Sequence, residues 1–403
     1  MTEKLFYQDS HLSEFKAKVI SCESAPHGVL KGKKGEFYGV ELDRTAFFPE
    51  GGGQYADTGM LDGVRVVDVQ ETDGRIFHVT ESPLRPGTTV TGKIDWEERF
   101  MKMQQHSGEH IVSGLVHSRF GYDNVGFHLG SENCTMDFNG EITKEQLSEI
   151  ELEANRAVWK DLEIQALYPS KEELSRIEYR SKIEIEGQVR IIVVPGYDVC
   201  ACCAPHVVHT GEIGVIKLTN VQRYKGGVRV TMLCGIRALK DYEVKQLQAG
   251  EISAMLCAKD NEIAEAVLRV KEETAHLKSQ LAEQEKKLID LRADMIPKDG
   301  EPVCIFSEDI EGESMRKLMN RALEDGHGFC AVFHGNEKIG FRYVMGSRGT
   351  NERKPVDMRI FVKEFNAKFN GRGGGKPEMV QGTAHGNEQD MRMWILEKAG
   401  ETG

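Results

Sequence analysis

The sequence predicts an α+β protein built from several domains. Its 403 residues exceed what one hydrophobic core usually supports, which favours about two to four domains. Residues 1–93 alternate apolar and polar side chains in short runs, as β-strands do, whereas apolar residues at helical spacing begin near residue 96. We therefore expect an N-terminal β-barrel domain, a two-layer α/β domain, a long helical segment and a C-terminal α/β domain.

Composition limits the class of protein. A hydrophobic content of 39% with ordinary glycine and proline indicates a folded chain. No apolar run approaches the ~20 residues that cross a bilayer, and the N-terminus lacks the apolar core of a signal peptide, so we expect a cytoplasmic protein. A net charge of −12 argues against non-specific coating of nucleic acid but permits a local basic face.

The first segment, residues 1–93, is expected to be the barrel. Four runs read as strands separated by Gly, Asp and Pro: FKAKVISCES, GEFYGVELDR, VRVVDVQETDGRIFHVT and TTVTGKID. Such a pattern is typical of a small barrel or sandwich.

The second segment, residues 94–240, mixes helices and strands. Apolar residues at steps of three and four predict a helix from Trp96 to about Arg119, and residues 144–161 predict a strongly amphipathic one. GFHLGSENCTMDF reads as strand, KEELSRI as a short helix, and VRIIVVPGYDV as a buried strand that ends in a Pro195-Gly196 turn.

The third segment, residues 241–297, carries a heptad pattern without proline until its end. The a positions are Val267, Thr274, Leu281, Leu288 and Met295, and the d positions are Ile263, Val270, Leu277, Gln284 and Leu291. Three arrangements fit: a solvated helix on its own domain, an antiparallel helical hairpin, or a coiled coil that joins two copies into a homodimer.

The fourth segment, residues 298–403, again alternates strand-like and helix-like patterns. Strand-like VCIFSE and FCAVFHG alternate with helical SMRKLMNRALED and VKEFNAKF, and a glycine-rich stretch, FNGRGGGKPEMVQGTA, follows. We expect a separate domain here.

The stretch VCACCAPHVVHTGEIG, residues 199–214, concentrates residues that bind metals. Of the nine cysteines, an odd number, three stand here, and in a reducing compartment such a cluster is more often metal-binding than disulfide-bonded. Cys200 and Cys203 form a CxxC pair, whereas Cys202 and His206 form a CxxxH pair. A redox CxxC would open a helix in a βαβ setting that the sequence lacks, and a second zinc site would find few further ligands.

A second pair, His106 and His110, lies four residues apart in the predicted helix and therefore projects from one face. Together with the CxxxH pair it supplies three nitrogens and one thiolate, a tetrahedral set suited to Zn²⁺. Such a set is structural unless one ligand is loose. Glu109 is a candidate general base, but it is rotated by ~100° from His110 on a helix, so we expect it to face solvent.

Two other stretches suggest ligand contacts. In DRTAFFPEGGGQYADTG, residues 43–59, three glycines offer bare N–H groups beside the polar side chains of Thr45, Gln54 and Asp57; the alternative is a turn between strands. In residues 215–235 a predicted hairpin with a Gly226-Gly227 tip carries cations that could bind phosphates. The alternative is that these cations only keep an exposed sheet edge solvated. These cations are Lys217, Arg223, Lys225 and Arg229.

These stretches, in this order, closely resemble the freestanding alanyl-tRNA editing proteins, called AlaX, and the editing domain of alanyl-tRNA synthetase. The family pattern PxGGGQxxDxG, HxxxH, CxxxH with TGEIG, and KGGxR is matched here from Pro49 to Arg229, and NGRGGGKPEMVQG resembles the end of the DHH-associated domain. One departure is Cys203, where the family usually has glycine. The long form of the family, with a coiled coil and C-terminal domain, is the one that the chain resembles.

The resemblance implies a zinc-dependent deacylase that hydrolyses seryl and glycyl esters wrongly attached to alanine tRNA. Because the chain starts at the editing β domain, we expect no aminoacylation activity. It also implies one zinc per chain, bound in segment 94–240. The implied zinc ligands are His106, His110, Cys202 and His206; the implied catalytic residues are Thr45, Gln54, His106 and Cys202. Expected substrate or tRNA contacts are Thr45, Gly52, Gly53, Gln54, Lys217, Arg223, Lys225 and Arg229.

Two alternatives stay open at this point. In the first, zinc is structural and the protein is a non-catalytic tRNA-binding or scaffold protein that acts through its helical segment. In the second, it is a zinc hydrolase of small aminoacyl esters, which would not require tRNA.

Overall fold

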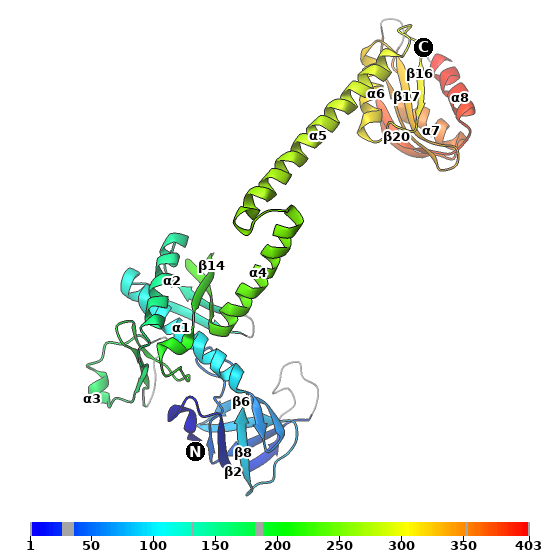
Figure 1. Ribbon diagram of the computed structural model, residues 1–403. Coiled ribbons are helices and arrows are strands. Elements are labelled where there is room, and N and C mark those ends of the chain that lie inside the picture. Colours follow the sequence, from blue (N-terminus) through cyan, green and yellow to red (C-terminus); the bar gives the residue numbers. More distant parts are fainter. Residues whose placement is uncertain (1, 26–35, 131–132, 182–187, 351–353, 402–403) are drawn as a thin grey trace. The chain divides into compact units, whose positions relative to one another are not determined.

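The computed structural model in Figure 1 describes residues 2–25, 36–130, 133–181, 188–350 and 354–401. Its internal contacts divide the chain into two units, Met1–Glu251 and Ile252–Gly403. The predicted mixture of helices and several sheets is confirmed, whereas the division into four segments stays a prediction. Gly35, Ser131 and Glu132, which belong to predicted strands, lie outside the described residues.

A closed barrel of antiparallel strands begins the first unit, in the order β2-β3-β7-β6-β5-β8 (Figure 1). Alternate side chains along β2 point inward to a core that includes Val19, because successive strand residues face opposite sides. Asp-Gly pairs with positive φ at residues 62–63 and 73–74 form the tight turns around β6. The strands are β2 (Glu14–Ser24), β3 (Tyr38–Leu42), β5 (Gly59–Leu61), β6 (Val64–Thr72), β7 (Arg75–Thr80) and β8 (Thr89–Ile94).

Three short elements lie beside the barrel strands. β1 (Glu3–Lys4) pairs in parallel with β4 (Arg44–Thr45), and the single-turn helix η1 (Leu5–Tyr7) follows β1 directly. Their side chains Leu5 and Phe6 are buried in the barrel core.

The predicted first helix is confirmed as α1 (Trp96–Phe120), which ends at Gly121 in the left-handed conformation. It packs between an antiparallel sheet and α2 (Lys144–Trp159), whose N-terminus carries a capping box. The sheet has the order β14-β15-β10-β9, formed by β14 (Ile216–Tyr224), β15 (Gly227–Cys234), β10 (Cys134–Phe138) and β9 (Asn124–Leu129).

A second, three-stranded sheet delivers the cysteine cluster. It has the order β11-β12-β13 and contains β11 (Gln165–Leu167), β12 (Ile191–Val194) and β13 (Asp198–Ala201). The predicted short helix is α3 (Lys171–Leu174), and the short helix η2 (Thr210–Ile213) follows the cluster. Between β13 and η2 the chain is irregular, as Pro205 predicts.

The predicted long helical segment is not one helix. α4 (Gly235–Leu256) ends before Cys257, whose positive φ of 50° breaks the helical geometry, and α5 (Ile263–Asp294) begins after the short helix η3 (Asp260–Glu262). Along α5 most heptad side chains are exposed, including Leu281 at 62% and Leu291 at 65%. A coiled coil and a homodimer stay predictions.

The second unit contains a five-stranded sheet in the order β16-β17-β18-β20-β19, in which only β16 and β17 are parallel. Its two faces carry separate cores, one under α6 and the end of α5, the other under α7 and α8 (Figure 1). The sequence did not predict α8. The elements are β16 (Val303–Ser307), α6 (Glu313–Glu324), β17 (Phe329–Asn336), β18 (Gly340–Ser347), α7 (Met358–Lys368), β19 (Arg372–Lys376), β20 (Met379–Ala384) and α8 (Glu388–Glu401).

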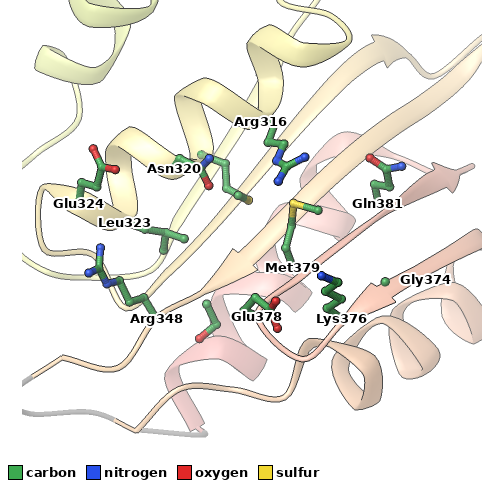
Figure 2. Close-up of a pocket in the computed structure, with 13 residues that line it drawn as sticks. Arg316, Asn320, Leu323, Glu324, Arg348, Gly374, Lys376, Glu378, Met379 and Gln381 are labelled. Carbon is green, nitrogen blue, oxygen red and sulfur yellow. The ribbon is translucent and has the colours of Figure 1, made fainter.

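A hollow of about 600 Å³ lies between α6 and the glycine-rich strand β19 (Figure 2). Arg316 and Lys376 line it together with the thioether of Met379. Gly374 contributes no side chain, and an added Cβ there would meet open space. The hollow therefore combines cations and bare backbone with apolar side chains and the carboxylates of Glu324 and Glu378.

Within the described part of the chain, every helix is too short or too polar to cross a membrane.

Candidate metal centre

Helix α1 places His106 and His110 one turn apart on the same face. Their ring centroids are 5.6 Å apart, and both side chains are buried at 2% exposure. This is the projection that the HxxxH spacing predicts.

The irregular segment after β13 brings Cys202 and His206 to the same point. Cys202 Sγ lies 3.5 Å from His106 Nε2 and 3.4 Å from His206 Nε2. The ring centroid of His206 is 4.6 Å from that of His110. The ligand atoms of all four residues lie within 4.8 Å of one another, so three imidazole nitrogens and one thiolate converge as a tetrahedral Zn²⁺ site requires.

Arg190 holds this irregular segment in place. Its guanidinium donates to the main-chain oxygens of Cys202 and Ala204 at 2.9 and 2.8 Å, and the Cys202 N–H donates to Arg190 O at 3.1 Å. A segment without regular ladder hydrogen bonds therefore keeps a fixed shape.

Each imidazole also has a partner for its outward nitrogen. The Nδ1 atoms of His106, His110 and His206 lie 3.0, 2.8 and 3.0 Å from Gln54 Oε1, Asp198 Oδ2 and Ser107 Oγ, respectively. Protein metal sites use such partners to fix the ring tautomer, which leaves Nε2 for the metal. The donor set thus fits a zinc ion in type, number and orientation.

Two of the four side chains already favour the charge state that binds a metal, Cys202 and His206. Burial alone would raise the pKa of the Cys202 thiol, but the imidazoles of His106 and His206 outweigh it and hold that pKa well below its ordinary value. Burial lowers the pKa of His206 to about 3, so its imidazole is neutral. A thiolate and a neutral imidazole are the forms that bind zinc.

Asp198, which sequence reasoning missed, connects His110 to a buried cation. Its carboxylate accepts from Arg180 Nε and Nη2 at 2.8 and 2.9 Å as well as from His110. Burial opposes ionisation of Asp198, yet these partners lower its pKa, and its hydrogen bond raises the pKa of His110 despite burial. A second group that could hold a metal, His110, Asp198 and Cys200, shares these residues.

We expect Asp198→Ala to weaken zinc binding by about 100-fold and Asp198→Asn, which keeps an acceptor for His110, by about 10-fold. Competition titration with a zinc chelator would measure both. Asp123→Asn is the matched control, because Asp123 pairs with the exposed His117 on the same helix. Equal affinities for Asp198→Ala and the control would contradict the role of Asp198.

The expectation that Glu109 faces solvent is wrong. Its side chain is buried at 1% exposure, and Oε1 accepts from Ser113 Oγ and Asn124 Nδ2 at 2.7 and 2.6 Å. Oε2 lies 3.9 Å from His110 Nε2. The helical angle was correct, but α1 is covered on all sides over residues 102–114, so no face of it is open there.

The glycine-rich loop docks on strand β9 beside the four ligands. Gly52 and Gly53 have φ of 61° and 80°, and a Cβ at Gly53 would lie 2.6 Å from Phe127 O. A Cβ at Gly52 would lie 3.3 Å from Cys203 Sγ, so the unusual cysteine contacts this loop. Leu129 N–H donates to Gly53 O at 2.9 Å, which fixes the loop against β9.

Asp57, at the end of this loop, binds helix α1 instead of pointing to a ligand. It accepts from Arg99 Nε and from Phe48 N–H, both at 2.8 Å, while Lys102 Nζ donates to Ala56 O at 2.6 Å. Arg99, Lys102 and Asp57 are all at most 1% exposed. This buried ion cluster joins the barrel loop to the helix that carries the histidines.

Thr45 is fully buried in the barrel, and its hydroxyl already has two partners. Its O–H lies 2.7 Å from His78 Nε2, while Phe47 N–H donates to Oγ1 at 3.1 Å. His78 Nδ1 donates to Val40 O, so Nε2 is the acceptor. Burial lowers the pKa of His78 to about 4, which keeps the ring neutral. Contact between Thr45 and a substrate stays a prediction, and it would require a vacant lone pair and access.

The predicted basic hairpin is formed by β14 and β15, but its turn residues are Lys225 and Gly226 rather than Gly226 and Gly227. Carboxylates pair with most of its cations. Lys217 contacts Glu151 at 2.6 Å, and Arg229 contacts Asp137 through two hydrogen bonds. Arg223 Nη2 lies 3.7 Å from Glu141, with an exposed side chain. Within the described residues, Lys225 at the turn has no carboxylate within 4.0 Å. The hairpin is therefore a weaker phosphate site than its sequence indicates.

Three family models match the chain. They are tRNA synthetases class II (A) over residues 1–98, the threonyl and alanyl tRNA synthetase second additional domain over residues 189–231, and the DHHA1 domain over residues 300–399. The second match contains Cys202 and His206, whereas His106 and His110 lie outside all three.

Curated relatives extend the match along the chain. Alanyl-tRNA editing protein AlaX-L of Pyrococcus horikoshii is 28% identical over 99% of this chain and 98% of its own length. The alanine–tRNA ligases of Archaeoglobus fulgidus and Pyrobaculum neutrophilum are 31% and 30% identical over 94% and 97% of this chain. The chain spans only 42% and 44% of those two ligases. The resemblance seen in the motifs thus extends to whole sequences: over nearly its full length the chain is similar to a long alanyl-tRNA editing protein and to part of the alanine–tRNA ligases.

Proposed function

We propose that this protein is a zinc-dependent deacylase that hydrolyses serine, and also glycine, from wrongly charged alanine tRNA. The observation that carries the proposal is the convergence of His106, His110, Cys202 and His206 in one buried centre, with an outer partner for each imidazole. The name of the Pyrococcus horikoshii relative and the second additional domain match support the editing role.

Zinc, when bound, acidifies water and polarises a carbonyl group. The chain's own residues would hold the ester beside that ion. Cys202 is only half-buried while the three histidines are buried, so the centre is approached from the Cys202 side, where the glycine loop and Cys203 also lie. Hydrolysis consumes one water, breaks the ester C–O bond, and leaves free amino acid and a ribose hydroxyl.

A hydrolytic site for serine would compensate for the limited selectivity of the pocket that selects alanine for attachment to tRNA. A pocket that accepts alanine rejects serine or glycine poorly, because one hydroxyl or methyl changes binding by only about 1–3 kcal/mol. A separate site that hydrolyses the wrong product multiplies the two selectivities. We also propose a cytoplasmic location, because the proposed substrate is charged tRNA.

Cations on both units support a tRNA partner. Lys225 and Arg223 extend from the hairpin in the first unit, and Arg316 and Lys376 line the hollow of the second (Figure 2). Among the described residues, neither Arg316 nor Lys376 has a carboxylate within 4.0 Å. Exposed cations beside bare backbone are suited to phosphate contact, and the carboxylates of Glu324 and Glu378 in the same hollow reduce its net positive charge.

We expect the zinc-loaded chain to release serine and glycine from alanine tRNA and to leave correctly charged alanyl-tRNA intact. Release of labelled amino acid, compared at equal enzyme concentration, measures this. Binding of tRNA without release would favour the scaffold alternative, whereas equal activity on an aminoacyl ester without tRNA would favour a small-ester hydrolase.

A further inference from the structure

Gln54 is a buried amide at the junction between the glycine loop and the metal centre. It is 1% exposed, and its Oε1 lies 3.0 Å from His106 Nδ1. Its Nε2 has no hydrogen-bond partner among the described residues. A buried amide group that lacks a partner is unusual, because leaving it unpaired costs stability.

The metal determines which end of this amide faces His106. If His106 binds zinc through Nε2, its proton is on Nδ1 and must be donated, so the Gln54 atom at 3.0 Å has to be the oxygen. Turning the amide around would place two donors together, or force the proton onto the nitrogen that zinc needs. The NH₂ group of Gln54 is therefore the end left without a partner.

The backbone gives Gln54 little freedom to find another partner. Its N–H donates to Gly51 O and its carbonyl accepts from Gly51 N–H, both at 3.0 Å, and it forms a parallel bridge with Leu129. The preceding Gly53 is pressed against Phe127. A donor held by these backbone hydrogen bonds and by the contact with His106 is in place before a substrate arrives, which is the arrangement that stabilises charge best.

We propose that Gln54 Nε2 donates a hydrogen bond to the carbonyl oxygen of the bound aminoacyl ester. This inference rests on the proposed function. As the water oxygen bonds to the carbonyl carbon, the π electrons move to the carbonyl oxygen, which the Gln54 N–H stabilises. When the C=O bond forms again, the C–O bond to the ribose breaks, and one proton of the water ends on the ribose oxygen.

The carbonyl oxygen is the acceptor that best fits this donor. The α-ammonium group of an amino acid only donates, and the side-chain hydroxyl is present in serine but absent from glycine. The carbonyl oxygen occurs in every aminoacyl ester and is the atom that gains negative charge. Gln54 thus has two functions: its oxygen orients His106, and its nitrogen contacts the substrate.

Gln54→Glu separates these two functions, because a carboxylate still accepts from His106 Nδ1–H but has no N–H to donate. We expect this variant to keep one zinc per chain, while kcat for both seryl-tRNA and glycyl-tRNA falls by about 10²–10³-fold. Gln54→Ala lacks both groups, so zinc affinity should fall as well, by about 10–100-fold. Gln248→Glu on the exposed face of α4 introduces the same charge away from the centre and should match the wild type.

Zinc content and the midpoint of thermal unfolding show whether each variant is folded and loaded before kinetics are compared. Loss of activity on seryl-tRNA alone would place the contact at the serine hydroxyl and overturn the inference. Full activity of zinc-loaded Gln54→Glu on both substrates would overturn it too. If the wild type itself released no amino acid, the proposed function would fail, but the zinc affinities of Gln54→Glu and Gln54→Ala would still test the orienting contact with His106.

Discussion

Replacing His110 by alanine should abolish deacylation and remove the bound metal. His110 contributes one of four convergent donor atoms. Its loss leaves zinc with three protein ligands, because the other three residues of this group each already supply their one donor atom. We expect kcat/KM to fall by at least about a thousandfold, a fraction of the ~10⁶-fold or greater acceleration typical of enzymes. Single-turnover release of labelled serine and elemental analysis of zinc measure the two effects.

The matched control for this experiment is His117→Ala. His117 lies on the same helix seven residues later, its side chain is 47% exposed, and it pairs with Asp123 at the surface. This variant should keep its zinc and its activity. A His110→Ala protein that retains one zinc per chain and deacylates at the wild-type rate would show that the four-ligand centre is wrongly assigned.

Local spacing singled out the two residue pairs of this centre as candidates, and the family resemblance favoured them as zinc ligands, which stays a prediction. HxxxH places two side chains on one helical face whatever the surrounding fold, and CxxxH with a proline predicts an irregular segment. The structure adds that both pairs meet, at distances of 3.4 and 3.5 Å between Sγ and Nε2. What spacing could not supply is the set of outer partners, because Gln54 and Asp198 lie 52 and 88 residues from the histidines they contact.

Asp198 nevertheless left a signal in the sequence. It is the first and only charged residue of β13, the short strand that leads directly to Cys202, and a charge that becomes buried there requires a partner. Its partners, Arg180 and His110, come from different elements and could be identified only in the folded chain.

Other expectations failed where burial or backbone geometry decided the outcome. Periodicity assigns Glu109 to a different face from His110, but it does not reveal that α1 is enclosed on every side over residues 102–114. Similarly, the sequence pattern did not reveal that the helical segment is interrupted at residues 257–262, where Cys257 has a positive φ. Side-chain patterns report the environment of a helix less reliably than its existence.

Replacing Asp57 by alanine should destabilise the first unit by about 3–5 kcal/mol, because it leaves Arg99 as a buried charge without its carboxylate. Urea unfolding, monitored at the transition of the first unit, measures this. Glu149→Ala is the control: it breaks the exposed pair with Arg119 and should cost no more than about 1 kcal/mol.

The same substitution has a consequence for the metal centre. Asp57 holds the end of the loop that presents Gln54 to His106, so Asp57→Ala should also lower kcat at temperatures where the protein is still folded. Arg99→Met removes the charge as well as its partner contact, and should lower kcat for the same reason. A cost below about 1 kcal/mol with unchanged kcat would mean that the loop keeps its place through Gly53, Phe127 and Leu129 alone, and that the buried ion cluster is not needed to position Gln54.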